Sequence, residues 1–124
     1  MAKESSLISI VDDDEFVRAS LRGLLRSLGY TVEAFSSAAE FLAFPRLDAI
    51  ACLITDINMP AITGIELFRM LIKEGRPIPT ILITAYPNDA ARTRALNDGV
   101  LCYLEKPFDD NELMRCVQRA LDGR

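Results

Sequence analysis

The sequence predicts an α/β protein whose five strands form one parallel sheet, with helices packed on both faces. Short apolar runs alternate five times with longer segments of helical period. Successive strand–helix units imply right-handed crossovers, which place helices on both sides of the sheet. Hydrophobic types make up 50% of the 124 residues, which is enough for the core of a single domain. We expect that domain to span residues 1–124, with its core at about 7–121.

The first strand is predicted at Leu7–Val11, an apolar run broken only by Ser9. It ends at three consecutive aspartates. Apolar residues then recur at intervals of three and four, the spacing of one helix face. Gly29 is expected to end this helix, because glycine readily adopts the backbone conformation found after a helix. The apolar stripe consists of Val17, Leu21, Leu24, Leu25 and Leu28.

The second strand and the second helix are predicted to be short. Thr31–Phe35 alternates polar and apolar residues, which indicates an edge strand with one solvent-facing side. Ser37 and Glu40 have the spacing of a capping box, in which two side chains satisfy free backbone N–H groups at a helix start. We expect Pro45 to end this helix.

Two buried strands follow, with a helix between them. Residues 49–54 form a continuous apolar run, the pattern of a strand covered on both faces, and the run ends at Thr55 and Asp56. Thr80–Thr84 is predicted as a second buried strand. The helix between them is expected to end near Gly75. Its apolar stripe consists of Ile65, Phe68, Leu71 and Ile72.

The last three elements are a weak helix, a strand and a final helix. Residues 89–98 are rich in alanine and arginine, and Gly99 is expected to end this helix. Residues 100–104 are predicted as the last strand. The apolar face of the final helix consists of Leu113, Val117 and Leu121.

Composition excludes several classes of function. Lysine and arginine total 14 and aspartate and glutamate total 18, so the formal net charge is −4. We therefore expect no direct nucleic-acid binding, since attraction to phosphates needs a basic face. The chain has no histidine. This excludes a Ser-His-Asp triad, an HExxH zinc site and a phosphohistidine of its own.

The three cysteines, Cys52, Cys102 and Cys116, lack metal-binding spacing. We expect them to be small core residues in a chain from a reducing compartment. The N-terminal residues lack the apolar stretch of a signal peptide, and no apolar run is long enough to span a bilayer. These features predict a cytoplasmic protein that does not enter the membrane.

Polar residues interrupt the chain where the predicted strands end. Asp12 and Asp13 follow the first strand, and Asp56 ends the third. Thr84 ends the fourth, and Lys106 follows the fifth. The carboxyl ends of parallel strands lie along one edge of an open sheet, where ligands bind at the switch in strand order. We therefore expect these five residues to converge on one cleft.

The residue types in this cleft indicate phosphoryl chemistry beside a divalent cation. Crowded carboxylates repel one another unless a cation joins them or one takes up a proton. Oxygen ligands without imidazole or thiolate favour Mg²⁺ or Mn²⁺ over zinc. A lysine and a hydroxyl can donate hydrogen bonds to phosphoryl oxygens. A neighbouring carboxylate can act as the nucleophile and form an acyl phosphate.

Each of these residues also has a purely structural interpretation. The acidic residues 12–15 would suit a helix N-terminus, and Asp56 could begin a turn. Thr84 could simply end a strand, and Lys106 could be a solvated surface residue. Unrelated causes would not place all of them at successive strand ends along one edge, so we favour a shared site.

Five motifs occur in a specific order and spacing: Ile-Val-Asp-Asp at 10–13, Thr-Asp-Ile-Asn-Met-Pro at 55–60, Gly64, Ile-Thr-Ala at 83–85 and Glu-Lys-Pro-Phe at 105–108. Together they resemble the receiver (CheY-like) domain of bacterial two-component response regulators. The resemblance covers nearly the whole chain. The last motif and the Val-Arg-x-Ser-Leu of the first helix are most similar to the FixJ-like subgroup of nitrogen-fixation regulators.

The resemblance implies a fold and a set of metal ligands. The fold would be the flavodoxin-like or CheY-like sheet, with strand order 2-1-3-4-5 and five helices. Asp56 would be the phosphoryl acceptor. Asp13, Asp56 and the backbone carbonyl of Asn58 would ligate Mg²⁺ or Mn²⁺, and Asp12 would hold a metal-bound water.

The resemblance also implies residues that contact the phosphoryl group and respond to it. Lys106 would pair with Asp56 and then with the phosphoryl oxygens, and Thr84 would bond to the phosphoryl group. Tyr103 would be the switch aromatic residue, at the surface before phosphoryl transfer and turned inward after it. The signal would leave through the last helix–strand–helix face, bordered by Arg92, Arg94, Arg115 and Arg119.

Two local expectations concern the orientation of single residues. The Lys106–Pro107 peptide bond is expected to be cis, which would turn Lys106 back over the acidic cluster. Asp13 is expected to point into the cleft, whereas Asp14 faces the start of the first helix.

The resemblance implies a signalling module and not an enzyme, apart from its own phosphorylation and slow autodephosphorylation. The phosphoryl donor would be a sensor histidine kinase or a histidine phosphotransfer protein, and a homodimer could form through the last helix–strand–helix face. A small metal-dependent phosphohydrolase is disfavoured, because the chain has no DxDxT-type loop and no room for a cap domain. A flavodoxin-type cofactor binder is disfavoured too, because a flavin phosphate needs donors where residues 12–15 are acidic.

Overall fold

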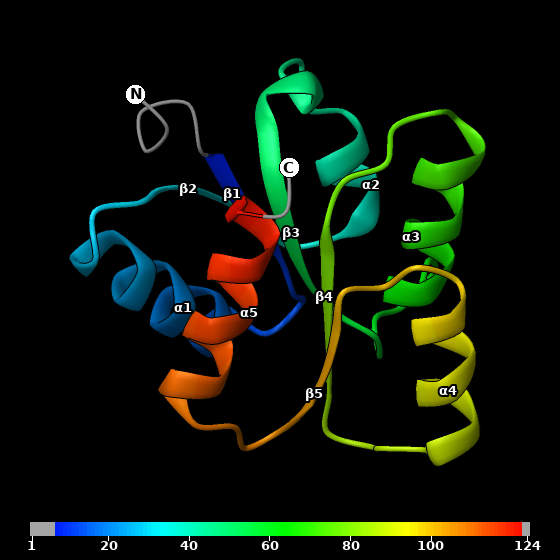
Figure 1. Cartoon of the computed structure of the whole chain (residues 1–124). Coiled ribbons are helices and arrows are strands. Elements are labelled where there is room, and N and C mark those ends of the chain that lie inside the picture. Colours follow the sequence, from blue (N-terminus) through cyan, green and yellow to red (C-terminus); the bar gives the residue numbers. More distant parts are fainter. Residues whose placement is uncertain (1–6, 123–124) are drawn as a thin grey trace.

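A five-stranded parallel sheet forms the centre of the structure, a computed structural model in which residues 7–122 are described (Figure 1). The strand order is β2-β1-β3-β4-β5, which confirms the predicted fold class. The first six and last two residues of the predicted domain lie outside the described residues. The elements in order are β1 (Leu7–Val11), α1 (Glu15–Ser27), β2 (Thr31–Phe35), α2 (Ala38–Leu42), the 3-10 helix η2 (Leu47–Ala49), β3 (Ile50–Asp56), α3 (Gly64–Lys73), β4 (Thr80–Thr84), α4 (Asp89–Asn97), β5 (Cys102–Glu105) and α5 (Asp110–Asp122).

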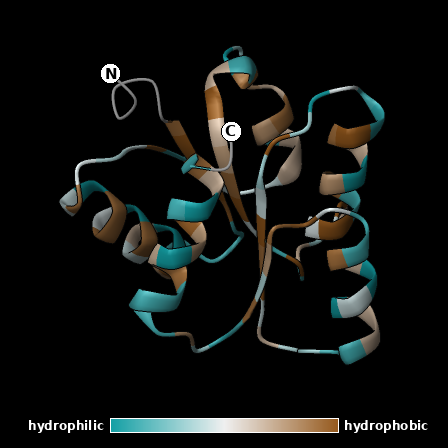
Figure 2. Cartoon of the chain, viewed as in Figure 1, coloured by the Kyte–Doolittle hydropathy of each residue, from teal (hydrophilic) through white to brown (hydrophobic). Residues whose placement is uncertain are grey.

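Helices cover both faces of the sheet. The helices α1 and α5 pack on one face, and α2, α3 and α4 pack on the other (Figure 1). Figure 2 shows the central strands mainly in brown and the helices in a mixture of brown and teal. Every residue of β1, β3 and β4 is buried, as expected for strands with helices on both sides. No helix within residues 7–122 is long and apolar enough to cross a membrane.

Three predicted strands, β1, β2 and β4, have the predicted bounds, whereas β3 and β5 differ at their ends. The short helix η2 occupies Leu47–Ala49, so β3 begins at Ile50. The predicted strand 100–104 was wrong at its start, because the N–H of Val100 donates to the carbonyl of Ala95 and closes the end of α4. The strand β5 therefore begins at Cys102 and extends to Glu105.

The helix starts are capped largely as the sequence predicts. Ser37 accepts the N–H of Glu40 at the start of α2, but Glu40 accepts the N–H of Ser36 and not that of Ser37. The prediction that Ile72 lies on the buried stripe of α3 was wrong, since its side chain is 47% exposed. Leu71 occupies the centre of the buried stripe, and Ile72 lies a further 100° or so around the helix, outside it.

All three cysteines are buried, as predicted. The structure adds a pairing that their spacing does not reveal, a disulfide between Cys102 of β5 and Cys116 of α5. Cys52 is a free thiol in β3. The pair forms because α5 packs across the sheet face to which Cys102 points, a relation between elements that residue spacing cannot show.

Candidate functional site

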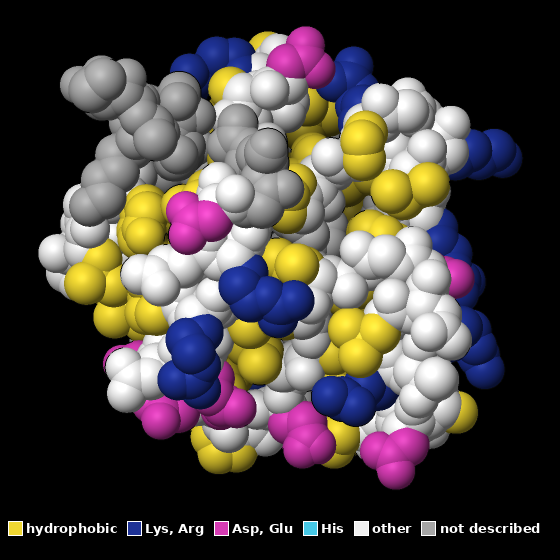
Figure 3. Space-filling view, in the orientation of Figure 1, with side chains coloured by type: hydrophobic (Ala, Val, Ile, Leu, Met, Phe, Trp, Pro, Cys, Tyr) yellow, Lys and Arg dark blue, Asp and Glu magenta, His cyan; other side chains and the backbone are white. Residues whose placement is uncertain are grey.

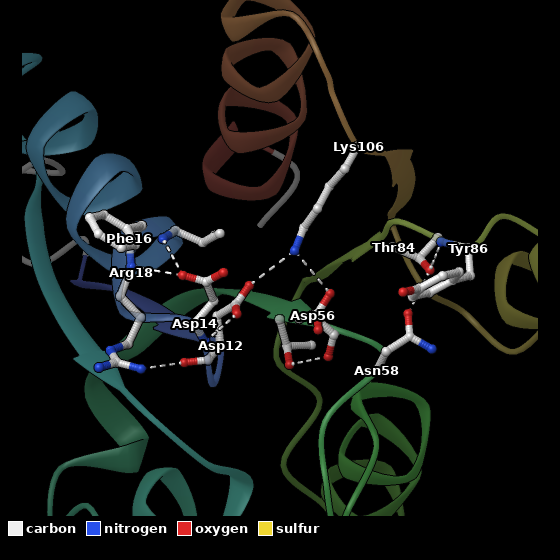
Figure 4. Close-up of polar contacts among 11 residues, drawn as sticks. Asp12, Asp14, Phe16, Arg18, Asp56, Asn58, Thr84, Tyr86 and Lys106 are labelled. Atoms are coloured by element: carbon white, nitrogen blue, oxygen red, sulfur yellow. Dashed lines mark hydrogen bonds and ion pairs between the residues drawn. The ribbon is translucent and has the colours of Figure 1, made fainter.

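The predicted acidic residues meet at the carboxyl ends of the strands. Figure 4 shows two of them, Asp12 and Asp56, on either side of the Lys106 amine. Carboxylate oxygens of Asp12, Asp13 and Asp56 all lie within 4.8 Å of one another. We call these three residues the acid pocket. Lys106 reaches into it from the end of β5, with its Nζ 3.4 Å from Asp12 Oδ2 and 3.3 Å from Asp56 Oδ1. The Lys106–Pro107 peptide bond is cis, as expected.

The members of the acid pocket differ in their access to solvent. Asp12 and Asp56 are 2% and 6% exposed, because they end strands that helices cover on both faces. Asp13 is exposed and lies at the open side of the pocket. A ligand from solvent therefore meets Asp13 first, and the two buried carboxylates lie deeper.

Burial and like charge govern the protonation of these groups. The pKa of Asp12 is raised mainly by burial, and the hydrogen bond from Asp14 and the charge of Lys106 offset part of this. The pKa of Asp56 is raised by burial and then by the neighbouring charge of Asp12. Burial alone would lower the pKa of Lys106, but the two carboxylates outweigh it and raise that pKa. Three acids facing one lysine leave an excess of negative charge, which favours a cation.

The loop after β1 positions Asp12 through backbone contacts. Asp12 Oδ1 accepts the N–H of Asp14 at 2.9 Å. Asp14 faces the helix start as predicted, where its carboxylate accepts the N–H groups of Phe16 and Val17. Arg18 donates from Nη1 to the carbonyl of Asp12 at 2.8 Å. The sequence analysis missed Arg18. Its position one helical turn after the acidic run could have indicated a contact with that run.

On the other side of the pocket, the hydroxyl of Thr84 is held by Asn58. Thr84 Oγ1 donates to Asn58 Oδ1 at 2.8 Å and accepts the N–H of Tyr86 at 2.9 Å. Figure 4 shows both contacts on the side of Asp56 away from Asp12. The sequence analysis used only the backbone carbonyl of Asn58, so this side-chain role was missed. No local spacing links residues 26 positions apart.

The loop between β3 and α3 passes close behind Asp56. A Cβ at Gly64 would overlap the backbone carbonyl oxygen of Asp56, so this position needs a glycine. The N–H of Gly64 donates to the carbonyl of Ile57 at 3.0 Å. Ala61 adopts a φ of 68°, a left-handed conformation that lets the N–H of Ile62 reach the carbonyl of Pro60. This folded loop holds the end of β3 in place.

The expectation that Tyr103 is exposed was wrong for this structure. Its side chain is 9% exposed and packs in a cluster with Phe68, Leu82 and Ala95. Its hydroxyl accepts the N–H of Asn88 at 3.3 Å. The ring is large and mostly apolar, so it is stable among these side chains while its hydroxyl keeps a polar partner.

The donor set of the pocket fits a small divalent cation. Three carboxylates supply hard oxygen ligands, and the sequence contains no histidine to compete. Such a set favours Mg²⁺ or Mn²⁺ over zinc. Both oxygens of Asp12 already have partners in Asp14 and Lys106, which fits a contact through water better than direct ligation.

Comparison of the sequence with known proteins supports the same conclusion. The sequence pattern of the response regulator receiver domain matches residues 8–118. Response regulator protein TodT of Pseudomonas putida is 37% identical over 121 residues, which cover 98% of this chain and 53% of that protein. Transcriptional regulatory protein FixJ of Azorhizobium caulinodans is 39% identical over 119 residues, which cover 95% and 56%. The chain thus spans about half the length of these relatives.

Solved structures show the same fold. The crystal structure of FixJ-N matches with a TM-score of 0.85 at 35% identity, covering 96% of this chain and 95% of that one. The response regulator StyR matches with a TM-score of 0.87 at 38% identity, covering 94% and 59%. Both confirm the predicted resemblance to response regulators, and the matches to FixJ and FixJ-N confirm its FixJ-like character. Sequence, fold and site agree that this chain belongs to the family of response regulator receiver domains of two-component systems.

Proposed function

We propose that this chain is a phosphorylation-switched receiver that accepts a phosphoryl group on Asp56. The observation that carries the proposal is the geometry of Asp56 itself. Its carboxylate ends a buried strand, lies in the same pocket as Asp12 and Asp13, and has Lys106 Nζ at 3.3 Å. This is an acceptor carboxylate beside a cation site and beside a fixed donor for phosphoryl oxygens.

In the transfer step, a carboxylate oxygen of Asp56 attacks the phosphorus of a phosphohistidine. A new P–O bond forms, the P–N bond breaks, and its electron pair leaves with the imidazole nitrogen, which takes up a proton. A phosphohistidine donor must lie outside these 124 residues, because they contain no histidine. We propose a sensor histidine kinase or a histidine phosphotransfer protein.

The cation would be Mg²⁺ or Mn²⁺, held by Asp13, Asp56 and the backbone carbonyl of Asn58, with Asp12 acting through water. When bound, it supplies positive charge that offsets the repulsion between the carboxylates and the incoming phosphoryl oxygens. Asp13 is the exposed member of the set, so it is the residue that admits the ion. Apart from this transfer and a slow loss of the same group, we propose no further catalysis.

Two residues then respond to the new phosphoryl oxygens. Lys106 keeps its position and donates to them, since its Nζ already lies beside Asp56. Thr84 must exchange its hydrogen bond to Asn58 for one to the phosphoryl group. A displaced Thr84 alters the end of β4, and Tyr103 lies on the paired strand, where Leu82 and Tyr103 are register partners.

We propose that the signal leaves through α4, β5 and α5, which we call the output face. Figure 3 shows Lys and Arg side chains spread across this face with apolar patches between them. Such a mixture suits a partner protein or a second copy of the chain. Four exposed arginines contribute to its border: Arg92, Arg94, Arg115 and Arg119.

The phosphodonor would approach on a different surface, beside Lys106. A groove of about 610 Å³ lies between the start of α1 and the turn after β5, and Lys106 is part of its lining. Phe16 is 87% exposed at its edge. A large exposed aromatic side chain next to the acceptor pocket fits contact with a donor domain. We therefore propose this groove as the docking site of the donor.

The central test is phosphorylation with a small donor. The chain is incubated with acetyl phosphate and Mg²⁺, and its intact mass is measured. We expect the mass to rise by one phosphoryl group in the native chain and to stay unchanged in Asp56→Asn. Equal labelling of both proteins would show that Asp56 is not the acceptor.

A further inference from the structure

A disulfide between Cys102 of β5 and Cys116 of α5 is not explained by the receiver site. The two Cα atoms lie 6.3 Å apart, within the range that a disulfide can span. We propose that these cysteines form a redox modification site, in which hydrogen peroxide reversibly converts a dithiol to the disulfide and the bond then restrains the output face. The second part of this proposal rests on the proposed function.

The two paired cysteines differ from the third in reactivity. Cys52 is fully buried in β3, and burial raises the pKa of its thiol to about 12. It is therefore neutral and inaccessible. Cys102 and Cys116 each keep 7% of their surface exposed, at the edge between β5 and α5. A small oxidant can reach this pair without unfolding the chain.

Arg119 gives the pair an activated member. Its Nη1 lies 3.6 Å from Cys102 Sγ, and its side chain is exposed. A guanidinium beside a sulfur favours the thiolate, which is the form that reacts with peroxide. Arg119 follows Cys116 by three residues, so one face of α5 supplies both the cation and the second sulfur. Cys102 is therefore the attacking residue, and Cys116 completes the bond.

The oxidation balances with hydrogen peroxide as the oxidant. The thiolate of Cys102 attacks one peroxide oxygen, the O–O bond breaks, and the departing hydroxide takes up a proton as water. The sulfur of Cys116 then attacks the resulting sulfenic acid, the S–O bond breaks, and a second water leaves as the S–S bond forms. Two thiols and one peroxide give one disulfide and two waters. A dithiol reductant reverses the change.

The surrounding core argues against a purely structural staple. Disulfides stabilise small domains that lack a sufficient core. Here β5 and α5 already meet through a buried apolar cluster that contains Leu104, Leu113 and Val117. The packing therefore holds the two elements together without the bond. A disulfide at this place therefore has little effect on whether α5 and β5 associate. Its main effect is to limit the movement of α5 against β5.

The position of the bond connects it to the output face. Neighbouring residues of a strand point to opposite sides of the sheet. Cys102 packs with α5 residues, and Tyr103 packs against Ala95 of α4. The disulfide thus ties α5 to the strand that carries Tyr103. Any movement of α5 against β5 during signalling is smaller in the oxidised chain.

The first experiment tests the redox chemistry on the folded chain. Reduced protein is treated with hydrogen peroxide, the peroxide is removed, and the protein is denatured, alkylated with iodoacetamide and weighed. We expect three alkyl groups before oxidation and one after it, on Cys52. Cys52→Ser should still form the bond, Cys116→Ser should not, and Arg119→Gln should form it several-fold more slowly. Three alkylated cysteines after oxidation, or a bond that dithiothreitol cannot reduce in the folded chain, would overturn the proposal.

The second experiment tests the restraint and separates it from the proposed function. Oxidised and reduced protein are both treated with acetyl phosphate and Mg²⁺, and backbone NMR shifts of α4, β5 and α5 are compared. We expect equal labelling of Asp56, with shift changes at least twofold smaller in the oxidised chain and restored by dithiothreitol. Cys116→Ser should not respond to peroxide. Equal shift changes in both forms would overturn the restraint, whereas absent labelling in the reduced chain would overturn the proposed function alone.

Discussion

The two sides of the acid pocket are held by different kinds of interaction. On the β1 and β3 side, Asp12 and Asp56 are buried carboxylates that share the charge of Lys106. Removing one partner of a buried charge leaves the other uncompensated, so such contacts are strongly coupled. The loop at Gly64 leaves no room behind Asp56. This side is fixed in geometry and unbalanced in charge.

On the β4 and β5 side, Thr84 and Tyr103 are held by neutral hydrogen bonds. Thr84 donates to Asn58, and the hydroxyl of Tyr103 accepts the N–H of Asn88. The neighbouring helix α4 buries only Ala95, whereas α5 buries four residues. Neutral hydrogen bonds contribute about 1 kcal/mol each and exchange easily. Elements with few buried contacts are those that move at low free-energy cost.

The difference separates binding from switching. In the proposed function, the charged side would bind the cation, whose positive charge offsets the excess negative charge of the carboxylates, and Asp56 would accept the phosphoryl group. The neutral side would provide the response, because its hydrogen bonds can be exchanged for new ones. Substitutions on the first side should therefore abolish the input, and substitutions on the second should only shift an equilibrium.

The largest effect is expected at the acceptor. Asp56→Asn removes the nucleophilic carboxylate but keeps the shape of the side chain, so labelling by acetyl phosphate should fall by about 100-fold or more. Intact mass spectrometry measures the labelled fraction. Asp48→Asn, a change at an exposed aspartate just before the start of β3, at the opposite end of that strand from Asp56, is the matched control and should label normally.

Gly64 tests the rigidity of the charged side. Gly64→Ala should lower the free energy of unfolding by about 2 kcal/mol, since the added Cβ overlaps the Asp56 carbonyl and backbone must shift. Gly23 lies in α1 with nothing near its Cβ position, so Gly23→Ala should raise stability by about 1 kcal/mol. Urea unfolding measures both. Similar changes in the free energy of unfolding for the two variants would contradict the close approach of Gly64 to the Asp56 carbonyl.

Asp13 and Asp14 should separate metal binding from helix capping. Asp13→Ala should weaken Mg²⁺ binding about tenfold or more, because it removes a carboxylate from the donor set. Asp14→Ala should leave Mg²⁺ affinity nearly unchanged and reduce stability by about 1 kcal/mol, the usual effect of losing an N-cap. Calorimetric titration with MgCl₂ and urea unfolding distinguish the two. If Asp14→Ala weakened Mg²⁺ binding as much as Asp13→Ala does, our assignment of Asp13 to the metal site would be wrong.

The raised pKa of Asp56 predicts a stability that depends on pH. The folded state holds the proton more tightly than the unfolded state, so this group favours folding at acidic pH, and that contribution is lost as pH rises through the folded pKa. Asp12 and Asp13 add to the negative charge, and Lys106 offsets only part of it. Without Mg²⁺, Asp56→Asn should therefore raise stability by about 1 kcal/mol at neutral pH, with a smaller gain at acidic pH. Thermal unfolding of both proteins at neutral and at acidic pH measures this stability gain. A gain that is larger at acidic pH would contradict the prediction.

The sequence predicted the charged side well because its residues lie at the ends of apolar runs. A buried strand is recognisable from its continuous apolar pattern, and the polar residues that end it must lie at the edge of the sheet. Asp12 directly follows its apolar run, and Asp56 and Lys106 are the second polar residues after theirs. The structure brings these three residues together. The same reasoning located β1 and β4 to the residue.

The neutral side was predicted less well because its contacts depend on how separate elements pack. The bond from Thr84 to Asn58, the burial of Tyr103 and the pairing of Cys102 with Cys116 each join segments whose relative orientation no local pattern encodes. The start of β5 was misplaced for a related reason, since Val100 has the apolar character of a strand residue but bonds back to α4.

The smallest effect is expected at Asn58, on the neutral side. Thr84 has one hydroxyl proton, which it donates to Asn58 Oδ1, so it cannot bond to a phosphoryl oxygen until that contact breaks. Asn58→Ala removes the acceptor but keeps the backbone carbonyl proposed as a metal ligand. One neutral hydrogen bond is worth about 1 kcal/mol, so affinity for beryllofluoride, a phosphoryl mimic, should rise about fivefold. Asn97→Ala, at the exposed end of α4, should have no effect. The gain in beryllofluoride affinity should also vanish in a Thr84→Ala background, because a double-mutant cycle isolates the interaction between Asn58 and Thr84. If the gain persisted there, Asn58 would act on something other than Thr84.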